Sequence, residues 1–131
     1  MSAARGVRGA TTVEKNDREA ILIATTEMLS LLVELNDLRV EDIASAWFTV
    51  TDDLNAEFPA FAARELGWTE VPLMCGREIP VPGAVPMCVR VLITWNTDKP
   101  QSKVRHAFLH GARVLRPGWA VDLSGETAAE P

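Results

Sequence analysis

The stretch CVRVLITW, residues 88–95, is a run of apolar and β-branched side chains interrupted only by Arg90 and Thr94. A strand that is apolar on both faces is typical of the middle of a sheet, where both faces are covered. The segment before it, residues 80–86, is rich in proline and glycine and indicates a loop. The sequence therefore predicts a central strand at residues 88–95, entered from an irregular connection.

Further strands are predicted at both sides of this one along the chain. In residues 6–13, Val7 and Gly9 alternate with Arg8 and Ala10, so Arg8 shares a face with small residues. Residues 43–51 are β-branched and apolar, and residues 71–79 are similar although Gly76 interrupts them. A short last strand is expected at residues 107–109.

The helices are predicted from periodicity and from their end signals. Apolar residues recur at helical spacing from Ile21 to Leu35, and Asn16 with Glu19 three positions later suits the start of this helix. Pro59 opens a short helix over residues 60–66, and Pro100 opens another that runs to about residue 105. Residues 111–116 carry no clear signal.

Length and charge limit what kind of protein this is. A chain of 131 residues that is 47% hydrophobic suits one domain, expected at residues 1–117, with a flexible tail at 118–131. A net charge of -5 argues against a nucleic-acid partner, because counterion release needs a dense basic surface. No apolar stretch suits a signal core or a membrane span, so we expect a cytoplasmic protein without a membrane partner.

Arginine stands where folding alone would not favour it, since Arg8 and Arg90 interrupt apolar or small-residue strands. Burying a guanidinium without a partner is costly, so each must reach solvent, pair with a carboxylate such as Glu78, or bind an anion. For either one alone, surface exposure or pairing is the commoner solution. Arg64 and Arg116 add charge that one acid cannot balance, which favours a ligand with two carboxylates.

Other chemistries receive little support from the sequence. There is no Gly-x-Ser-x-Gly, P-loop, His-Glu-x-x-His or dinucleotide fingerprint. His106 and His110 are interpreted as structural or surface residues, and Cys75 as a small buried thiol without a neighbouring base. Cys75 and Cys88 lack the spacing of metal ligands, so neither a metal nor a disulfide is expected.

Short blocks along almost the whole chain resemble the monofunctional AroH-type chorismate mutases. The first is VRGATTVE at residues 7–14, and Cys88-Val89-Arg90-Val91 matches the strand that carries the main catalytic arginine of that family. The other matching blocks lie, in family order, at residues 49–54, 58–60, 63–66, 71–78, 96–106 and 115–117.

This resemblance implies an α+β fold with a mixed β-sheet and helices packed on one face. It also implies a homotrimer that forms a pseudo α/β-barrel, with active sites in clefts between subunits. The implied reaction is the Claisen rearrangement of chorismate to prephenate, with no covalent intermediate and no cofactor.

The resemblance also assigns roles to individual residues. Arg90 is expected to contact the ether oxygen, Arg8 the side-chain carboxylate, and Glu78 with Cys75 the ring hydroxyl. Arg64 and Arg116 match outer arginines that attract the dianion. The remaining residues of the implied binding site shape its walls: Phe58, Leu73, Met74, Phe108 and Leu115.

Two positions depart from the family pattern. Phe108 stands where many members carry tyrosine, so one hydroxyl donor to the substrate is missing. Phe61 stands where some members carry lysine, which weakens long-range attraction of the substrate. Two alternatives stay open at this point: a trimer that binds a metabolite anion without turning it over, and an imine or enamine deaminase of similar architecture.

Overall fold

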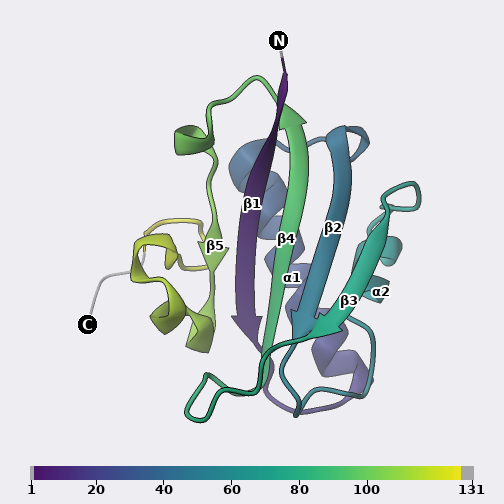
Figure 1. Cartoon of the computed structure of the whole chain (residues 1–131), viewed down its shortest axis with the longest axis vertical. Helices are drawn as coiled ribbons and strands as arrows, with labels where there is room; N and C mark the ends of the chain where they lie inside the picture. Colours follow the sequence, from purple (N-terminus) through teal and green to yellow (C-terminus); the bar gives the residue numbers. More distant parts are fainter. Residues whose placement is uncertain (1, 128–131) are drawn as a thin grey trace.

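The computed structural model describes residues 2–127, which fold into one five-stranded mixed sheet with two α-helices. Its strands are β1 (Ala3–Thr12), β2 (Ile43–Val50), β3 (Leu73–Arg77), β4 (Cys88–Thr97) and β5 (Ala107–Phe108). They are arranged in the order β3-β2-β4-β1-β5 (Figure 1). The predicted α+β class and the central place of residues 88–95 are therefore confirmed.

The two neighbours of β4 both run antiparallel to it, whereas each edge strand is parallel to its own neighbour. Arg90 lies opposite Thr49 on β2 and opposite Ala10 on β1, and Arg8 lies opposite Leu92. Arg8 and Arg90 are thus diagonal neighbours on one face, a relation that places Cβ atoms roughly 7–8 Å apart in sheets.

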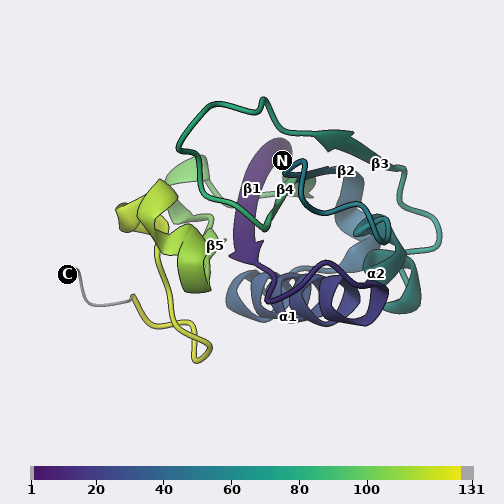
Figure 2. The ribbon, with the colours of Figure 1, turned by 90° about the horizontal axis from the view of Figure 1, so that it is seen from below.

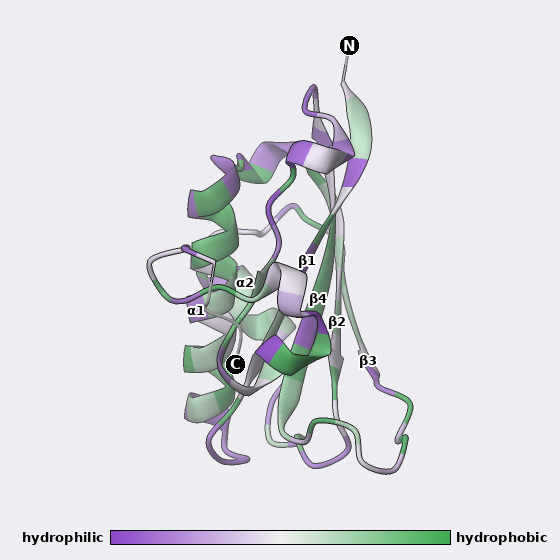
Figure 3. Cartoon of the chain, turned by 90° about the vertical axis from the view of Figure 1, so that its left-hand side faces the viewer, coloured by the Kyte–Doolittle hydropathy of each residue, from purple (hydrophilic) through white to green (hydrophobic). Residues whose placement is uncertain are grey.

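Both α-helices, α1 (Arg18–Asn36) and α2 (Ala60–Glu65), cover the same face of the sheet (Figures 2 and 3). The apolar face of α1 turns toward the strands and buries Ile21, Met28 and Leu32 completely. On β4, Val89, Val91 and Ile93 point into the same layer, and each is at most 1% exposed. The predicted alternation in β1 is confirmed, since Val7 belongs to this core and Arg8 lies on the opposite, open face.

Several predicted element ends differ from the structure. Asp17, not Asn16, caps α1, because its Oδ1 accepts a hydrogen bond from the Ala20 N–H at 2.7 Å. Asn16 instead donates to Asn55 Oδ1 at 2.8 Å and so joins the start of α1 to the loop after β2. The strand expected at residues 71–79 is shorter, because only five of its residues pair with β2. The helix expected after Pro100 is a single 3-10 turn, Gln101–Lys103.

Of the segment without a clear signal, residues 111–115 belong to a 3-10 helix, η3 (His110–Leu115), and Arg116 connects it to η4 (Pro117–Trp119). Packing against the domain continues beyond the boundary expected at 117, since Ala120 and Val121 are 6% and 4% exposed. The Val121 N–H donates to the Phe108 carbonyl at 3.1 Å. The last part of the expected tail, residues 128–131, lies outside the described residues.

A buried asparagine connects the helix layer to the segment that leads into β5. Asn36, at the end of α1, is 1% exposed; its Oδ1 accepts from the Arg105 N–H at 2.8 Å and its Nδ2 donates to the Arg105 carbonyl at 2.9 Å. Both backbone groups of Arg105 are therefore fixed by one side chain.

Among residues 2–127, no helix combines the length and the apolarity that a membrane span requires.

Gly9 is the closest point of approach between β1 and α1. A Cβ atom built at Gly9 would lie 2.8 Å from Leu32 Cδ1 and 3.2 Å from Met28 Cγ, both on α1. Because cores accept added methyl groups poorly, we expect Gly9→Ala to lower the free energy of unfolding by about 1–3 kcal/mol.

Equilibrium urea denaturation followed by circular dichroism measures this difference. Gly76→Ala is the matched control, because a Cβ at Gly76 would have no heavy atom within 4 Å. Equal unfolding midpoints for the two variants would contradict the tight contact at Gly9.

Candidate active site

Arg90 occupies the middle of the open face of the sheet. Its side chain is 23% exposed, yet its Nε is buried and has no hydrogen-bond partner among the described residues. The nearest carboxylate oxygen, Glu78 Oε2, lies 3.7 Å away. A buried guanidinium donor without an acceptor is uncommon and costly, so it marks a position where a ligand oxygen would be stabilised.

Glu78 is held in place by the neighbouring strand. It follows β3 directly, its backbone N–H donates to the Val50 carbonyl at 2.9 Å, and its carboxylate accepts from Thr49 Oγ1 at 2.5 Å. Thr49 lies opposite Arg90 in the register of β2 and β4. One threonine thus fixes the carboxylate that faces the arginine. Sequence reasoning missed this positioning role, although Thr49 lies two residues after Trp47 and shares the open face with it.

Arg8 lies beside Arg90 in a strongly cationic environment. Burial lowers the pKa of Arg8, and the positive charge of Arg90 lowers it further. The negative charge of Glu78 raises this pKa, and the positive charge of Arg116 lowers it. Two other guanidinium groups therefore act on Arg8, and one carboxylate partly balances them. The arrangement favours an anion with more than one carboxylate, as the sequence predicts.

These groups line a cleft of about 520 Å³ on the open face, which we call the arginine cleft. Its walls are apolar next to the charges, because Trp47 and Leu92 are 48% and 43% exposed there. The residues that line the arginine cleft are Arg8, Trp47, Thr49, Glu78, Arg90, Val91 and Leu92. Cys75, expected to act with Glu78, is not among them.

A second cleft of about 450 Å³, the edge cleft, lies between α2 and β3. It contains five of the predicted site residues: Phe58, Arg64, Leu73, Met74 and Cys75. Phe58 and Met74 are 69% and 55% exposed, and burial raises the pKa of the Cys75 thiol. The two clefts share no lining residue. One chain therefore divides the predicted site into two parts.

The last predicted residues, Phe108, Leu115 and Arg116, lie beside the arginine cleft. Phe108 is 3% exposed and packs with Ala10 and Cys88, and Arg8 Cζ lies 5.5 Å from the centre of its ring. Arg116 is exposed, and its Cζ lies 3.8 Å above the ring of Trp119. Phe108, which lacks the hydroxyl group of tyrosine, is thus a buried residue that packs against the Arg8 side chain.

His106 supports Arg8 from the other side, which sequence reasoning did not foresee. The Arg8 N–H donates to His106 Nδ1 at 2.9 Å, so this nitrogen must be unprotonated. Burial, followed by the charges of Arg8 and Arg116, lowers the pKa of His106. No local pattern signals this role, because the contact joins residues that are 98 positions apart.

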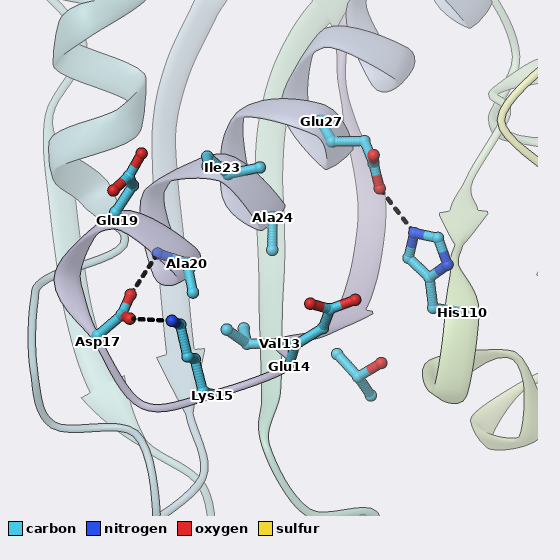
Figure 4. A pocket seen from close by; sticks show the side chains of 11 residues that line it. Val13, Glu14, Lys15, Asp17, Glu19, Ala20, Ile23, Ala24, Glu27 and His110 are labelled. Atoms are coloured by element: carbon cyan, nitrogen blue, oxygen red, sulfur yellow. Dashed lines mark hydrogen bonds and ion pairs between the residues drawn. The ribbon is translucent and has the colours of Figure 1, made fainter.

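Another hollow, of about 690 Å³, lies between α1 and η3 (Figure 4). Its lining includes Glu14, Glu19 and Glu27, and His110 Nε2 lies 2.7 Å from Glu27 Oε1. None of the predicted site residues reaches it, and its carboxylates would repel an anion.

Within residues 2–127, no three His, Cys, Asp or Glu side chains come together in a group that could hold a metal ion.

The fold and this arginine set correspond to a known family of enzymes. The sequence model of the family described as chorismate mutase type I matches residues 4–119. The chain therefore belongs to the chorismate mutase type I family, whose members are isomerases.

Individual relatives agree with this assignment. The chain is 52% identical over 114 residues to chorismate mutase AroH of Thermus thermophilus, covering 86% of this chain and 93% of the relative. It is 46% identical over 123 residues to chorismate mutase AroH of Bacillus subtilis strain 168, covering 93% and 97% of the two chains. A solved chorismate mutase from Clostridium thermocellum superposes with a TM-score of 0.82 at 48% identity, covering 83% of this chain and 97% of that one. These relatives give no support to the deaminase or the non-catalytic binder.

The lowered pKa of His106 makes a prediction about stability. Above the ordinary histidine pKa of about 6.5, folded and unfolded chains both hold a neutral ring, and the bond to the Arg8 N–H contributes about 1 kcal/mol. As pH falls below that value the unfolded chain takes up the proton more readily, so stability is lost. His106→Asn keeps an acceptor that cannot titrate.

We therefore expect the free energies of unfolding of wild type and His106→Asn to converge between pH 7.5 and pH 5. Urea denaturation at several pH values measures the gap. A gap that stays constant or widens toward pH 5 would show that His106 is not held neutral by its surroundings.

Proposed function

We propose that this chain catalyses the rearrangement of chorismate to prephenate, in active sites formed between the subunits of a homotrimer. The observation that carries the proposal is the pair of arginines, Arg8 and Arg90, beside Glu78 on the open face, with Arg116 near enough to act on Arg8. Chorismate carries two carboxylates, an ether oxygen and a ring hydroxyl, and this set offers a complementary charge for each. The names of the relatives support the same reaction.

In the proposed mechanism Arg90 meets the negative charge that develops on the ether oxygen. The enol-pyruvyl C–O bond breaks while the new C–C bond forms, and the electrons move within the substrate, so no proton is transferred. A guanidinium suits this role because it stays charged and is already in place before the reaction. The buried Nε of Arg90 is a donor that has no acceptor within residues 2–127 of the same chain.

Orientation of the substrate is the second part of the mechanism. Arg8 binds the side-chain carboxylate, and Glu78 with Cys75 addresses the ring hydroxyl. Arg64 and Arg116 attract the dianion from outside, while Phe58, Leu73, Met74 and Leu115 form apolar walls. Binding holds chorismate in its compact conformer, so binding free energy offsets the cost of reaching the reactive geometry. The activation free energy of the unimolecular step is lowered by that amount. Without a hydroxyl at Phe108, binding is weaker by about 1 kcal/mol.

The assembly proposal follows from the division of the site. The arginine cleft holds the groups for the reacting atoms, whereas the edge cleft holds Cys75, Arg64 and apolar wall residues. A symmetric ring in which the edge cleft of one subunit faces the arginine cleft of the next would complete every site. The exposure of Trp47, Met74 and Leu92 on the open face supports burial against another subunit.

The setting of the reaction is proposed with it. We place the protein in the cytoplasm, in the shikimate pathway toward aromatic amino acids. The net charge of -5 supports a small anionic substrate bound at a local cationic site rather than a nucleic acid partner. The reaction as proposed requires no cofactor.

Replacement of Arg90 tests the proposed chemistry. We expect Arg90→Ala to lower kcat by at least about 10²-fold, the scale seen when a pre-organised donor is removed from a transition state. Arg90→Lys should be nearly as poor, because an ammonium cannot reproduce the planar fork of the guanidinium. Loss of chorismate absorbance in a purified-protein assay measures both variants, and near wild-type turnover in either would refute the role of Arg90.

Mixing two inactive variants tests the shared site. Arg90→Ala damages the arginine cleft, and Arg64→Glu damages the edge cleft by repelling the substrate. If each site joins clefts from two chains, random reassembly of an equal mixture restores up to about one quarter of the sites.

The measurement is the chorismate assay after joint denaturation and refolding of the two variants. A mixture of Arg90→Ala with Arg8→Ala, both in the arginine cleft, is the control and should recover nothing. No recovery in the first mixture, despite normal oligomer size, would place the complete site within one chain.

A further inference from the structure

An aromatic group connects the two arginines that flank the arginine cleft on the β5 side. It consists of His106, Phe108 and Trp119, and we call it the aromatic bridge. The ring of Trp119 lies 4.0 Å from that of His106 and 5.7 Å from that of Phe108, in the second case edge to face. His106 accepts from the backbone of Arg8, Phe108 lies under the Arg8 side chain, and Arg116 lies over Trp119.

Trp119 is the central member of this bridge. Its backbone N–H donates to the Arg116 carbonyl at 2.9 Å, which closes the turn that brings the indole under the guanidinium. The two residues after it return to β5, where Ala120 bridges to Phe108. The indole is thus held on both sides by ordered backbone, whereas Arg116 itself is exposed.

Charge repulsion between Arg116 and Arg8 explains why Arg116 needs the contact with Trp119. Arg116 acts on Arg8 in the direction that lowers its pKa, so these two guanidinium groups are close enough to repel each other. A free, exposed arginine would turn toward solvent under that repulsion. The face of an indole is the strongest aromatic partner for a cation, and the distance of 3.8 Å between Cζ and the ring is within its range.

His106 keeps the bridge from adding to the repulsion. The charged groups acting on it are Arg8 from β1 and Arg116 from the turn between η3 and η4, and both favour the neutral ring. A neutral imidazole can accept from the Arg8 N–H and stack on Trp119 at the same time. The bridge therefore links the backbone of one arginine to the guanidinium of another without introducing a third cation.

We propose that Trp119 is a positioning residue that holds the Arg116 guanidinium beside Arg8 against charge repulsion, so that Arg116 is in place before the dianion binds. This inference rests on the proposed function, in which Arg116 attracts and retains chorismate. Because such an outer contact is equally strong in the ground state and the transition state, its loss raises KM and leaves kcat nearly unchanged.

Steady-state kinetics on a cycle of variants test the coupling. We expect Arg116→Ala to raise KM on the order of tenfold and Trp119→Leu to raise it about fivefold, with kcat within about twofold in both. The double variant should match Arg116→Ala alone, because the indole acts through that arginine. Trp119→Phe should recover most of the affinity that Trp119→Leu loses, since phenylalanine keeps a π face of similar bulk.

The control is Val114→Ala, a truncation in η3 of a side chain that is 68% exposed and lies outside the bridge. It should leave KM and kcat at wild-type values. Three results would each overturn the positioning role. The first is a double variant whose KM increase is the product of the two single increases. The others are equal losses of affinity in Trp119→Phe and Trp119→Leu, or a lower kcat at unchanged KM.

A readout without substrate separates this inference from the proposed function. The Hδ protons of Arg116 lie next to the indole and should carry a ring-current shift in the NMR spectrum of the intact protein. We expect the shift to disappear in Trp119→Leu and to persist in Val114→Ala. A wild type that does not rearrange chorismate refutes the proposed function alone, whereas an unchanged Arg116 spectrum in Trp119→Leu refutes the positioning role in either case.

Discussion

Repulsion of the Arg8 guanidinium by two neighbouring arginines is the constraint to which the rest of the structure responds. Arg90 and Arg116 both act on Arg8, and Glu78 balances only part of their charge. Each arginine has its own means of restraint: Arg90 comes from the central strand, Arg8 is held by His106 and Phe108, and Arg116 lies on Trp119. The hydrophobic core on the other face provides the rigid sheet on which these restraints depend.

The elements that follow from local pattern could be predicted from the sequence. Residues 88–95 are apolar on both faces, a pattern that correctly predicts a central strand, although one face stays open in the single chain and Leu92 is 43% exposed there. The alternation around Arg8 correctly separates the core face from the open face. Element ends were predicted less well. Asn16 and Asp17 are adjacent cap residues with nearly equal propensity, and Asn16 has another partner, Asn55, that lies 39 positions away.

For the proposed site, the sequence indicates which residue types take part but not how they are arranged. The surplus of arginine over acid pointed to an anion, and the resemblance supplied the residue roles, which remain proposals. Sequence could not reveal that one chain separates Cys75 and Phe58 from Arg90, because that division depends on how β3 and α2 pair at the edge of the sheet. Thr49, His106 and Trp119 were missed for a similar reason, since long-range backbone and ring contacts leave no periodic signal.

Asn36 connects the covered face of the sheet to the open one. Its amide fixes both backbone groups of Arg105, and the next residue along the chain is the histidine that supports Arg8. The end of a helix in the covered layer thereby positions the histidine ring that supports Arg8 on the open face. Substitutions at this asparagine would consequently be felt on both faces of the sheet, although its own side chain belongs to the helix layer.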